Sequence, residues 1–441
     1  RVPTPFPGVH DCSSYLGGGD RFQDVGKQGD VAKDTLPNLV RHHLGTATHC
    51  VSKPTCVPPV NLILWRSRVS NGLTLETGGS FMKLQELETS PIGRVVPIIG
   101  EQRAYVPGPL PRHLELDGRL VYRLDEASRS VATLAGVGET IPNPHLLIRP
   151  FVRREAVLSS KLEGTQASLS DLFIYEASGV RKGDVIEVVN YIRALELGLA
   201  ELDKVPISVR LMNRMHARLL QRVRGEEKGP GELRSAQVWI GHEGTQIGEA
   251  RFVPPPPEKV RDLMLDWLQF ANEELPTMPP LIQCALLHYQ FEAIHPYLDG
   301  NGRLGRALIT LYLCQKKILP TPLLYLSAYF EQNRTLYYDQ LYNLSVTGRW
   351  EIWIRYFLDG VVEQAQDALR RIRRIRQLQD EYRRKLQDRR ESGNALRLLD
   401  ELFASPIITA PRTAQLIGIT NAGARGMLKR LVSAGILREM E

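Results

Sequence analysis

The spacing of hydrophobic residues along the chain predicts a mainly α-helical protein. Residues 120–135 place Leu124, Ala127, Val131 and Leu134 on one helix face, at intervals of three and four. The glycines and prolines of residues 136–144 are expected to end this helix. Further helices are predicted at residues 150–163, 184–200, 209–223, 260–271, 281–294 and 308–313.

The clearest strand signal falls in residues 237–253. A short segment at 237–241, a turn at 242–245 and a returning segment at 246–253 predict a β-hairpin. Four consecutive prolines follow at 254–257, and they prevent further pairing because proline has no backbone N–H. The pattern therefore predicts one hairpin in an otherwise helical chain.

A long basic helix is predicted at residues 361–391. Between Arg370 and Arg390, ten basic residues stand against three acids, a surplus as large as the net charge of +7 of the whole chain. The apolar residues of this helix form one stripe, which packs either on the core or on a second copy of the chain in a homodimer. The stripe consists of Leu369, Ile372, Ile375, Leu378, Tyr382 and Leu386.

Residues 394–441 predict a small separate module. Helices are expected at 395–403, 409–417 and 420–435, and a strand at 436–439. This order is typical of a winged helix-turn-helix, whose third helix could meet DNA through Arg425, Lys429 and Arg430. A module that binds protein or makes a dimer is the other interpretation, because two glycines inside that helix weaken it.

The composition is that of a soluble globular protein of two to four domains. The 441 residues are 43% hydrophobic and 24% charged. No apolar run approaches the ~20 residues that a membrane helix needs, so no membrane partner is expected. The five cysteines lack metal-binding spacing, and Cys284 and Cys314 lie in apolar helical segments. A reducing, cytoplasmic location is therefore predicted.

Residues 1–81 differ from the rest of the chain. They begin with Arg, hold three of the five cysteines and show no sustained helical or alternating period. The first methionine is Met82, where an orderly sequence starts. We expect residues 1–81 to be translated upstream sequence or an overextended gene prediction, and to be disordered. A native N-terminus well before Met82 would contradict this expectation.

The residues from Phe291 to Arg306 concentrate several chemical groups. His295 is a candidate general base, and the carboxylate of Asp299 is a hard ligand suited to Mg²⁺. A glycine-rich turn that opens a helix presents free backbone N–H groups to phosphate. Arg303 and Arg306 lie three residues apart and can bind the same phosphates. Each feature alone is typical of an ordinary turn, whereas the whole set predicts a nucleotide site.

The run from His295 to Arg306 resembles the signature of the Fic (Fic/Doc) family, H-x-F-x-D/E-G-N-G-R-x-x-R. Tyr297 stands where the family usually has Phe, and because this position packs into the core, the added hydroxyl is a mild change. The resemblance covers about residues 105–360. It implies a Fic helical core in which the hairpin at 237–253 is the flap that clamps a target segment by strand addition.

The resemblance also implies an activity: transfer of AMP from ATP to a Ser, Thr or Tyr hydroxyl of a protein, which includes the enzyme itself. In this reaction His295 takes the hydroxyl proton, Asp299 holds Mg²⁺ on the phosphates, and pyrophosphate leaves. Tyr338 is the candidate for the adenine side of the site, with a place in the core as the alternative. The nucleotide-binding residues that the motif implies are Gly300, Asn301, Gly302, Arg303, Leu304, Gly305 and Arg306.

Residues 159–164 resemble the inhibitory motif of the same family, S/T-x-x-x-E-G/N. Ser159 and Glu163 are four residues apart, so they share one helix face, and Gly164 follows as the helix stop. An acid near a helix C-terminus is mildly unfavourable, which argues for a partner elsewhere. The resemblance implies that Glu163 pairs with Arg306 and blocks the γ-phosphate; an ordinary helix end is the other interpretation.

These predictions divide the chain into five segments. They are a leader at 1–81, a Fic N-terminal region with the inhibitory helix at 82–182, the Fic core at 183–360, a basic linker helix at 361–393 and the winged-helix module at 394–441. Two other functions stay open: a Fic transferase that uses another nucleotide or a phosphate donor, and a DNA-binding regulator whose core senses nucleotide. Gly302 favours a nucleotidyl donor, because the kinase-like Doc branch has Lys there. The intact His295 and Arg306 count against the regulator.

Overall fold

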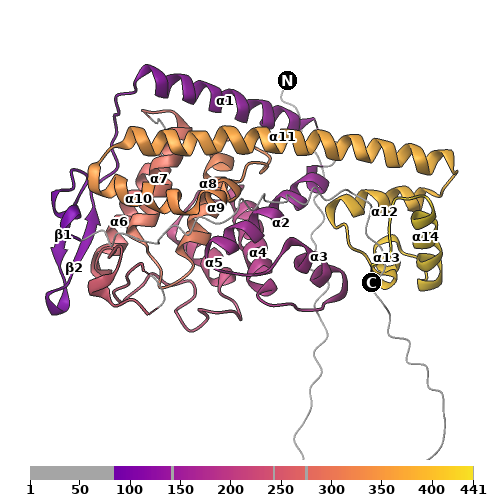
Figure 1. Ribbon diagram of the computed structural model, residues 1–441, viewed down its shortest axis with the longest axis horizontal. Coiled ribbons are helices and arrows are strands. Elements are labelled where there is room, and N and C mark those ends of the chain that lie inside the picture. Colours follow the sequence, from indigo (N-terminus) through magenta and orange to yellow (C-terminus); the bar gives the residue numbers. More distant parts are fainter. Residues whose placement is uncertain (1–83, 141–143, 242–243, 274–276, 441) are drawn as a thin grey trace, which may run out of the picture. The chain divides into compact units, whose positions relative to one another are not determined.

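The computed structural model describes residues 84–140, 144–241, 244–273 and 277–440. The expectations for residues 1–81 lie outside the described residues, as does the middle of the turn predicted at 242–245. The described part is mainly helical, as predicted, with fourteen α-helices and a two-stranded sheet (Figure 1). None of the described helices combines the length and the apolar composition of a membrane span.

The elements follow one another in a simple order. The strands are β1 (Gly93–Pro97) and β2 (Arg103–Pro107), with short 3-10 helices at Leu84–Thr89, Ile99–Glu101 and Ile247–Glu249. The helices before the motif are α1 (Gly118–Glu139), α2 (Pro144–Leu162), α3 (Leu169–Ser178), α4 (Val185–Leu202), α5 (Val209–Leu219), α6 (Pro257–Ala271) and α7 (Pro280–Ile294). Those after it are α8 (Asn301–Gln315), α9 (Ser327–Gln332), α10 (Arg334–Thr347), α11 (Trp350–Asp388), α12 (Gly393–Ala404), α13 (Ala410–Ile417) and α14 (Asn421–Ser433).

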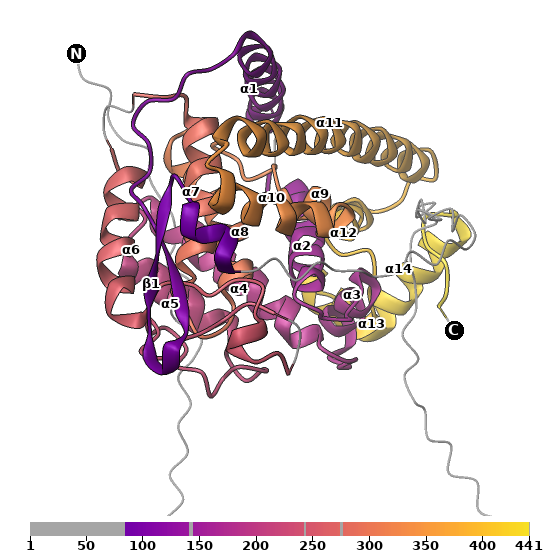
Figure 2. The same ribbon diagram turned by 60° about the vertical axis from the view of Figure 1, so that its left-hand side comes forward.

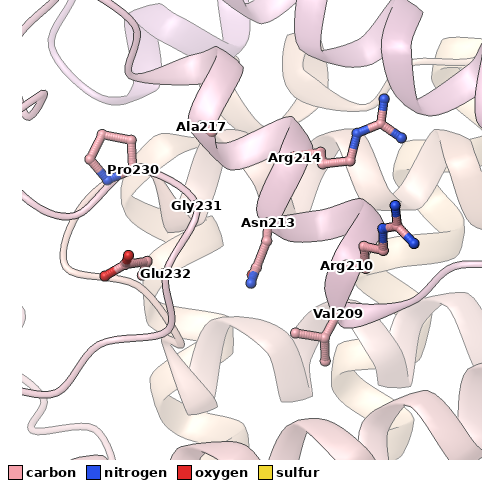
Figure 3. A pocket seen from close by; sticks show the side chains of 8 residues that line it. All are labelled: Val209, Arg210, Asn213, Arg214, Ala217, Pro230, Gly231 and Glu232. Atoms are coloured by element: carbon pink, nitrogen blue, oxygen red, sulfur yellow. The ribbon is translucent and has the colours of Figure 1, made fainter.

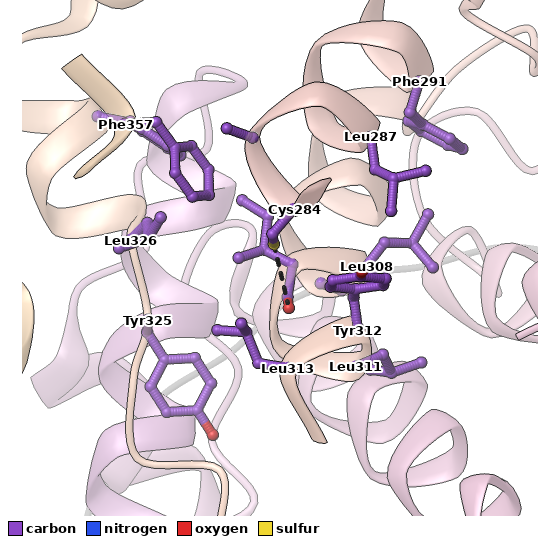
Figure 4. Packing of buried hydrophobic residues seen from close by; sticks show 14 of the residues in the cluster. Cys284, Leu287, Phe291, Leu308, Leu311, Tyr312, Leu313, Tyr325, Leu326 and Phe357 are labelled. Atoms are coloured by element: carbon purple, nitrogen blue, oxygen red, sulfur yellow. Dashed lines mark hydrogen bonds between the residues drawn. The ribbon is translucent and has the colours of Figure 1, made fainter. Parts of the chain in front are cut away.

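The consecutive helices α7 and α8 lie in the main hydrophobic core. Nearly every residue of both is buried, which agrees with the apolar sequence of α7 and of the second half of α8. Figure 4 shows side chains of α7, including Cys284 and Leu287, packed near those of α8, including Leu308. The thiol of Cys284 lies 3.9 Å from the carbonyl oxygen of Ile309, so this cysteine fills the core. The loop between the two helices, residues 295–300, is therefore anchored at both ends.

Helix α1 continues through the glycines that were expected to end it. Gly138 is buried, and a Cβ atom there would lie 3.1 Å from the Cβ atom of Thr321. The glycine permits this close approach, and the packing outweighs the cost of about 1 kcal/mol that glycine carries in a helix. Beyond this contact, α1 packs along α11 (Figure 1).

Helix α2 begins before its predicted start at Pro150, which lies inside the helix. Its packing against α4, α9 and α12 outweighs the hydrogen bond that an internal proline removes. Helix α3 was not predicted at all. Its signal was local: the side chains of Ser168 and Asp171 each accept the other's backbone N–H and form a capping box.

One continuous helix, α11, replaces the predicted core segment and linker helix. It passes through Gly360, where a Cβ atom would lie 2.6 Å from the ring of Tyr329, so the glycine serves packing rather than a helix end. The predicted apolar stripe packs within the chain. Its first part, including Ile372, joins the main core, and its second part, including Leu386, joins the core of the C-terminal helices. A homodimer stays a prediction.

The predicted hairpin at 237–253 is much reduced in the structure. Within the described residues it consists of one bridge, in which Ile240 and Phe252 exchange both backbone hydrogen bonds at 2.8 and 3.2 Å. The side-chain amide of Gln237 donates to the carbonyls of Val238 and Pro254, both at 2.9 Å, and the prolines at 254–257 have no backbone N–H to donate to a partner strand. Strand propensity alone therefore overestimated the regular pairing.

A second hairpin, β1–β2, was not predicted as strands. The two strands pair antiparallel from Gly93 opposite Pro107 to Pro97 opposite Arg103. Strand β2 packs on α7 (Figure 2). The backbone N–H of Tyr105 in β2 donates to the carbonyl of Val253 at 2.8 Å, so this hairpin supports one side of the predicted flap.

Helices α12, α13 and α14 confirm the three predicted helices of the C-terminal module. The predicted strand at 436–439 is reduced to a single bridge residue, Arg438. Arg425, Lys429 and Arg430 are exposed on α14, and Arg430 forms an ion pair with Glu391. Helix α12 packs on α2. Both the wing and DNA binding stay predictions.

Candidate functional site

His295 ends helix α7 in a left-handed backbone conformation. Its φ of 51° is uncommon for a residue other than glycine. Its Nδ1 lies 3.4 Å from the carbonyl oxygen of Glu292, and a carbonyl can only accept. The proton of the neutral ring therefore belongs on Nδ1, which leaves Nε2 with the free lone pair. Burial, followed by the charge of Arg234, lowers the pKa of His295 to about 4, so the ring is neutral at pH 7.

Tyr297 and Asn301 fix the loop between α7 and α8. The side-chain oxygen of Asn301 accepts the N–H of Tyr297 at 2.9 Å, and its amide donates to the Tyr297 carbonyl at 2.8 Å. The ring of Tyr297 is fully buried, which confirms its predicted core position. Its added hydroxyl donates to the side chain of Asn213 at 2.8 Å, so it is satisfied.

His216 of α5 supports the same loop, and sequence reasoning missed it. Its Nδ1 accepts the N–H of Gly231 at 2.9 Å, so Nε2 carries the proton and donates to the carbonyl of Asp299 at 2.8 Å. Its ring stacks on that of Tyr297, with centroids 3.9 Å apart. Burial lowers its pKa to about 4, which keeps it neutral. A lone histidine on an amphipathic helix gave no signal of this role.

The N-terminus of α8 presents the predicted phosphate seat. Gly300 has a φ of 75°, and its N–H donates to the carboxylate of Asp299 at 2.6 Å. The N–H of Leu304 makes the first helical hydrogen bond, to the carbonyl of Gly300. The backbone N–H groups of the residues before Leu304 therefore have no acceptor within the helix. The carboxylate of Glu163 already lies close to this helix N-terminus, because a Cβ atom at Gly302 would overlap with Oε1 of Glu163.

Glu163 and Arg306 form an ion pair at this seat. Oε1 of Glu163 lies 2.7 Å from Arg306, whose side chain is 1% exposed. Arg306 also donates to the hydroxyl and to the carbonyl of Ser159, both at 2.8 Å. Burial alone would raise the pKa of Glu163, but Arg306 outweighs burial and the pKa is lowered, so the carboxylate is charged. Gly164 follows with a φ of 94°, which turns the chain away.

The other motif arginine, Arg303, is held by a carboxylate that the sequence did not reveal. Its side chain is 1% exposed and lies 3.3 Å from Glu187 of α4 and 3.6 Å from Asp299. Glu187 also accepts the hydroxyl of Thr165 at 2.7 Å. Among the described residues, the Nε of Arg303 is buried without a hydrogen-bond partner. Each motif arginine thus pairs with an acid that precedes the motif in the chain, Arg306 with Glu163 and Arg303 with Glu187.

Glu187→Gln is expected to lower the free energy of unfolding by about 1–3 kcal/mol, because it leaves the buried Arg303 without its closest counter-charge. Urea denaturation followed by tryptophan fluorescence measures this loss. Glu201→Gln is the matched control, since it breaks a pair with Arg214 at the surface and should leave the midpoint unchanged. Equal midpoints for both variants would contradict the prediction.

The side chain of Asp299 is suited to bind a metal ion. Burial would raise its pKa, but Lys228 and Arg303 outweigh burial and the pKa is lowered, so the group is an ionised carboxylate. The ammonium of Lys228 lies 3.0 Å from its Oδ2. The described residues contain no group of three or more potential metal ligands. A Mg²⁺ ion held mainly by phosphates and water needs only one or two protein carboxylates, so Asp299 suffices.

The remaining predicted residues surround Glu163 or face the core. The hydroxyl of Tyr338 lies 3.4 Å from the carbonyl of Leu162, directly before Glu163. Burial, followed by Glu163, raises the pKa of Tyr338 to about 12. The side chain of Leu304 is fully buried, and a Cβ atom at Gly305 would overlap with the carboxylate of Glu292. The nucleotide contacts of these residues stay predictions.

Glu292 is a second carboxyl beside Arg306 that the sequence did not single out. Burial raises its pKa to about 8, although Arg306 opposes the shift. Its Oε1 is buried without a hydrogen-bond partner in the described part of the chain. At pH 7 this group is therefore mainly protonated, and Glu163 rather than Glu292 neutralises Arg306.

A separate groove of about 540 Å³ is lined by residues of α5 and of the loop that follows it (Figure 3). It contains no residue of the motif itself. Two of its residues nevertheless support the motif, since Gly231 donates to His216 and Asn213 accepts from Tyr297. The groove is lined by Val209, Arg210, Asn213, Arg214, Ala217, Pro230, Gly231 and Glu232.

Known proteins are similar to parts of this chain. The protein adenylyltransferase fic-1 of Caenorhabditis elegans is 29% identical over 158 residues, which cover 35% of this chain and 29% of the relative. The protein adenylyltransferase Fic of Drosophila melanogaster is 28% identical over 205 residues, which cover 45% and 38%. The chain thus spans about a third of the length of these curated relatives.

Two solved structures are also similar. A Fic family protein from Desulfovibrio desulfuricans G20 has a TM-score of 0.48 at 18% identity, over 73% of this chain and 90% of that one. Fic-1 of Caenorhabditis elegans has a TM-score of 0.44 at 22% identity, over 58% and 74%.

Two sequence families match adjacent parts of the chain. Residues 121–200 match the Fic/DOC family N-terminal region, and residues 206–313 match the Fic/DOC family itself. The first match contains Glu163, and the second contains the whole run from His295 to Arg306. The chain therefore contains a Fic/DOC domain, preceded by the N-terminal region of the same family.

Proposed function

We propose that the protein is an autoinhibited AMP transferase. It moves AMP from ATP to a Ser, Thr or Tyr hydroxyl of a protein, which includes the enzyme itself, and releases pyrophosphate. One observation carries the proposal: a charged glutamate, Glu163, occupies a helix N-terminus beside Arg306, where a phosphate would bind. The names of the two curated relatives described above, both protein adenylyltransferases, support this reaction.

The reaction begins with the target hydroxyl at His295. The neutral imidazole takes the hydroxyl proton on Nε2, and the hydroxyl oxygen forms a bond to the α-phosphorus of ATP. The bond from the α-phosphorus to the bridging oxygen breaks, and pyrophosphate leaves with its electron pair. Mg²⁺ bound to the phosphates would be held by Asp299 and would offset their negative charge, after Lys228 has left that carboxylate.

The chain's own groups stabilise the charge that develops. The N–H groups at the start of α8 point at the phosphates, and the helix dipole favours their negative charge. In this proposal Arg303 binds the β-phosphate and Arg306 the γ-phosphate. Both arginines are held by packing before the nucleotide arrives, which lowers the ordering cost of the transition state.

Glu163 keeps this site inactive. Its carboxylate and the γ-phosphate compete for the same guanidinium of Arg306, and both cannot occupy the seat at Gly302. The hydroxyl and the carbonyl of Ser159 accept two further N–H groups of Arg306, so residues 159–163 engage three of its N–H groups. A nucleotide that binds in this state lacks its γ-phosphate contact and is misaligned for attack.

The Glu163→Gly protein tests the reaction type. Incubation with Mg²⁺ and ATP, with and without a cell lysate, should transfer label from [α-³²P]ATP to protein and none from [γ-³²P]ATP. Intact mass spectrometry should show an increase of one AMP group per modified hydroxyl. Transfer of the γ label would identify a phosphate donor, and a UMP increase in parallel reactions with UTP would identify another nucleotide. No transfer with any donor would favour a nucleotide-sensing regulator.

A further inference from the structure

Arg234 is a buried arginine in the loop between α5 and the predicted flap. The residue is 3% exposed, and within the described residues its side chain donates to backbone carbonyls alone. Nε binds the carbonyl of His295 at 2.8 Å, and a terminal nitrogen reaches that of Ile294 at 3.3 Å. Two further N–H groups bind the carbonyls of Ala236, at 3.2 Å, and Pro255.

The charge of Arg234 has no close counter-charge. In the described part of the chain it forms no ion pair, and the acid that acts on it electrostatically is Glu258. Burial lowers its pKa to about 10, so the guanidinium still carries its proton at pH 7. Burying a cation costs free energy unless the cation is paired or hydrogen-bonded. The hydrogen bonds of Arg234 therefore have to offset the cost of burying its charge.

The first of these groups is the end of helix α7. The last carbonyls of a helix have no partner in the helix, and Ile294 and His295 are the last residues of α7 and its cap. Arg234 satisfies both carbonyls and places its charge at the negative end of the helix dipole. Its backbone N–H also donates to the carbonyl of Pro296 at 2.9 Å. Three consecutive carbonyls of the His295 turn are therefore bound by one residue.

The second group consists of the two ends of the predicted flap. Ala236 and Pro255 flank the segment 237–253 on its two sides, and the same guanidinium binds both carbonyls. The turn that carries His295 and the segment predicted to present the target are thus fixed to one rigid planar group.

We propose that Arg234 is a positioning residue for His295. Arg234 holds the left-handed turn at His295 in a fixed position relative to the predicted flap, and it places a fixed positive charge beside the imidazole. This inference rests on the proposed role of His295 as the base. The charged groups that act on the ring are Arg234, Glu163 and Asp299, with burial as the largest influence. The cation disfavours protonation of the ring, whereas the two acids favour it.

The test compares Arg234→Met and Arg234→Lys in the Glu163→Gly background. Arg234→Met should lower kcat of AMP transfer by about 100-fold and leave the KM for ATP within about twofold, because the phosphate seat is untouched. Arg234→Lys keeps the charge but loses the planar fork, so it should restore part of the loss. NMR of ¹⁵N-labelled histidine should show the pKa of His295 rising toward its ordinary value of about 6.5 in Arg234→Met only.

Arg112→Met is the control, because it removes an arginine that pairs with Glu273 away from the motif. It should leave the His295 titration unchanged. An unchanged kcat or an unchanged His295 titration in a folded Arg234→Met protein would overturn the inference. The titration needs no turnover, so a Glu163→Gly protein without AMP transfer would refute the proposed function separately. If Arg234→Met does not fold, Arg234→Lys decides: a kcat equal to that of the parent would likewise overturn the inference.

Discussion

Glu163→Gly is expected to raise the rate of AMP transfer by about 10- to 100-fold at equal protein concentration. The Glu163 carboxylate accepts a charge-assisted hydrogen bond from Arg306 at 2.7 Å, a contact that contributes about 1.5–3 kcal/mol. Each 1.4 kcal/mol changes an equilibrium about tenfold, so loss of this contact shifts the site toward the nucleotide-competent state by that factor. Initial rates with [α-³²P]ATP and a fixed recipient protein measure the change.

Glu163→Gln is the matched variant for this prediction. The glutamine keeps the shape and one acceptor oxygen but removes the charge that Arg306 stabilises. Its rate should fall between those of the wild type and Glu163→Gly. Equal labelling by the wild type and Glu163→Gly would show that the Glu163–Arg306 pair does not restrain the enzyme, and the proposal of autoinhibition would be wrong.

The glycine turn that opens α8 could be predicted because its determinants lie close together in the sequence. Asn301 binds Tyr297, four residues earlier, and Gly300 supplies the positive φ that begins α8. The pairing of Glu163 with Arg306 was also expected, although 143 residues separate them, because both belong to motifs of one family. The resemblance to a family thus predicted a contact that no local sequence pattern encodes.

The supports outside the motif could not be predicted in this way. His216 binds the carbonyl of Asp299 from 83 residues away, and Glu187 binds Arg303 from 116 residues away. Such contacts depend on how α4 and α5 pack on α8, and neither helix carries a spacing that marks one of its polar residues. The sequence shows that these residues are polar, whereas only the packed helices show what they bind.

The strands show a related limit. The segment 237–253 has strand propensity, yet within the described residues it forms one bridge, because side chains and prolines take the other backbone partners. The pair β1–β2 escaped prediction although its register is regular, since prolines 97 and 107 stand at its ends and discourage a strand assignment. Strand pairing is a tertiary property, so local propensity misplaced it in both cases.

The rate of the Glu163→Gly enzyme is expected to stay within about twofold between pH 8 and pH 5.5. Burial and Arg234 hold the pKa of His295 at about 4, so the imidazole is protonated, and unable to act as a base, only below that pH. Glu163 favours the protonated ring, so its removal lowers this pKa further. Initial rates across this range, with ATP saturating at each pH, test the prediction; an acid limb centred near 6.5 would contradict it.

His295→Ala in the Glu163→Gly background should lower kcat by about 10²- to 10⁴-fold, the usual contribution of a positioned general base. The affinity for ATP, measured by calorimetry, should stay unchanged, because the phosphate seat is built from α8 and not from the imidazole. His216→Ala separates the two histidines: His216 supports the Asp299 carbonyl, so its loss should weaken the seat and raise the KM for ATP. Full transfer activity in His295→Ala would overturn the mechanism, whereas a lost kcat with intact ATP binding assigns the proton transfer to His295.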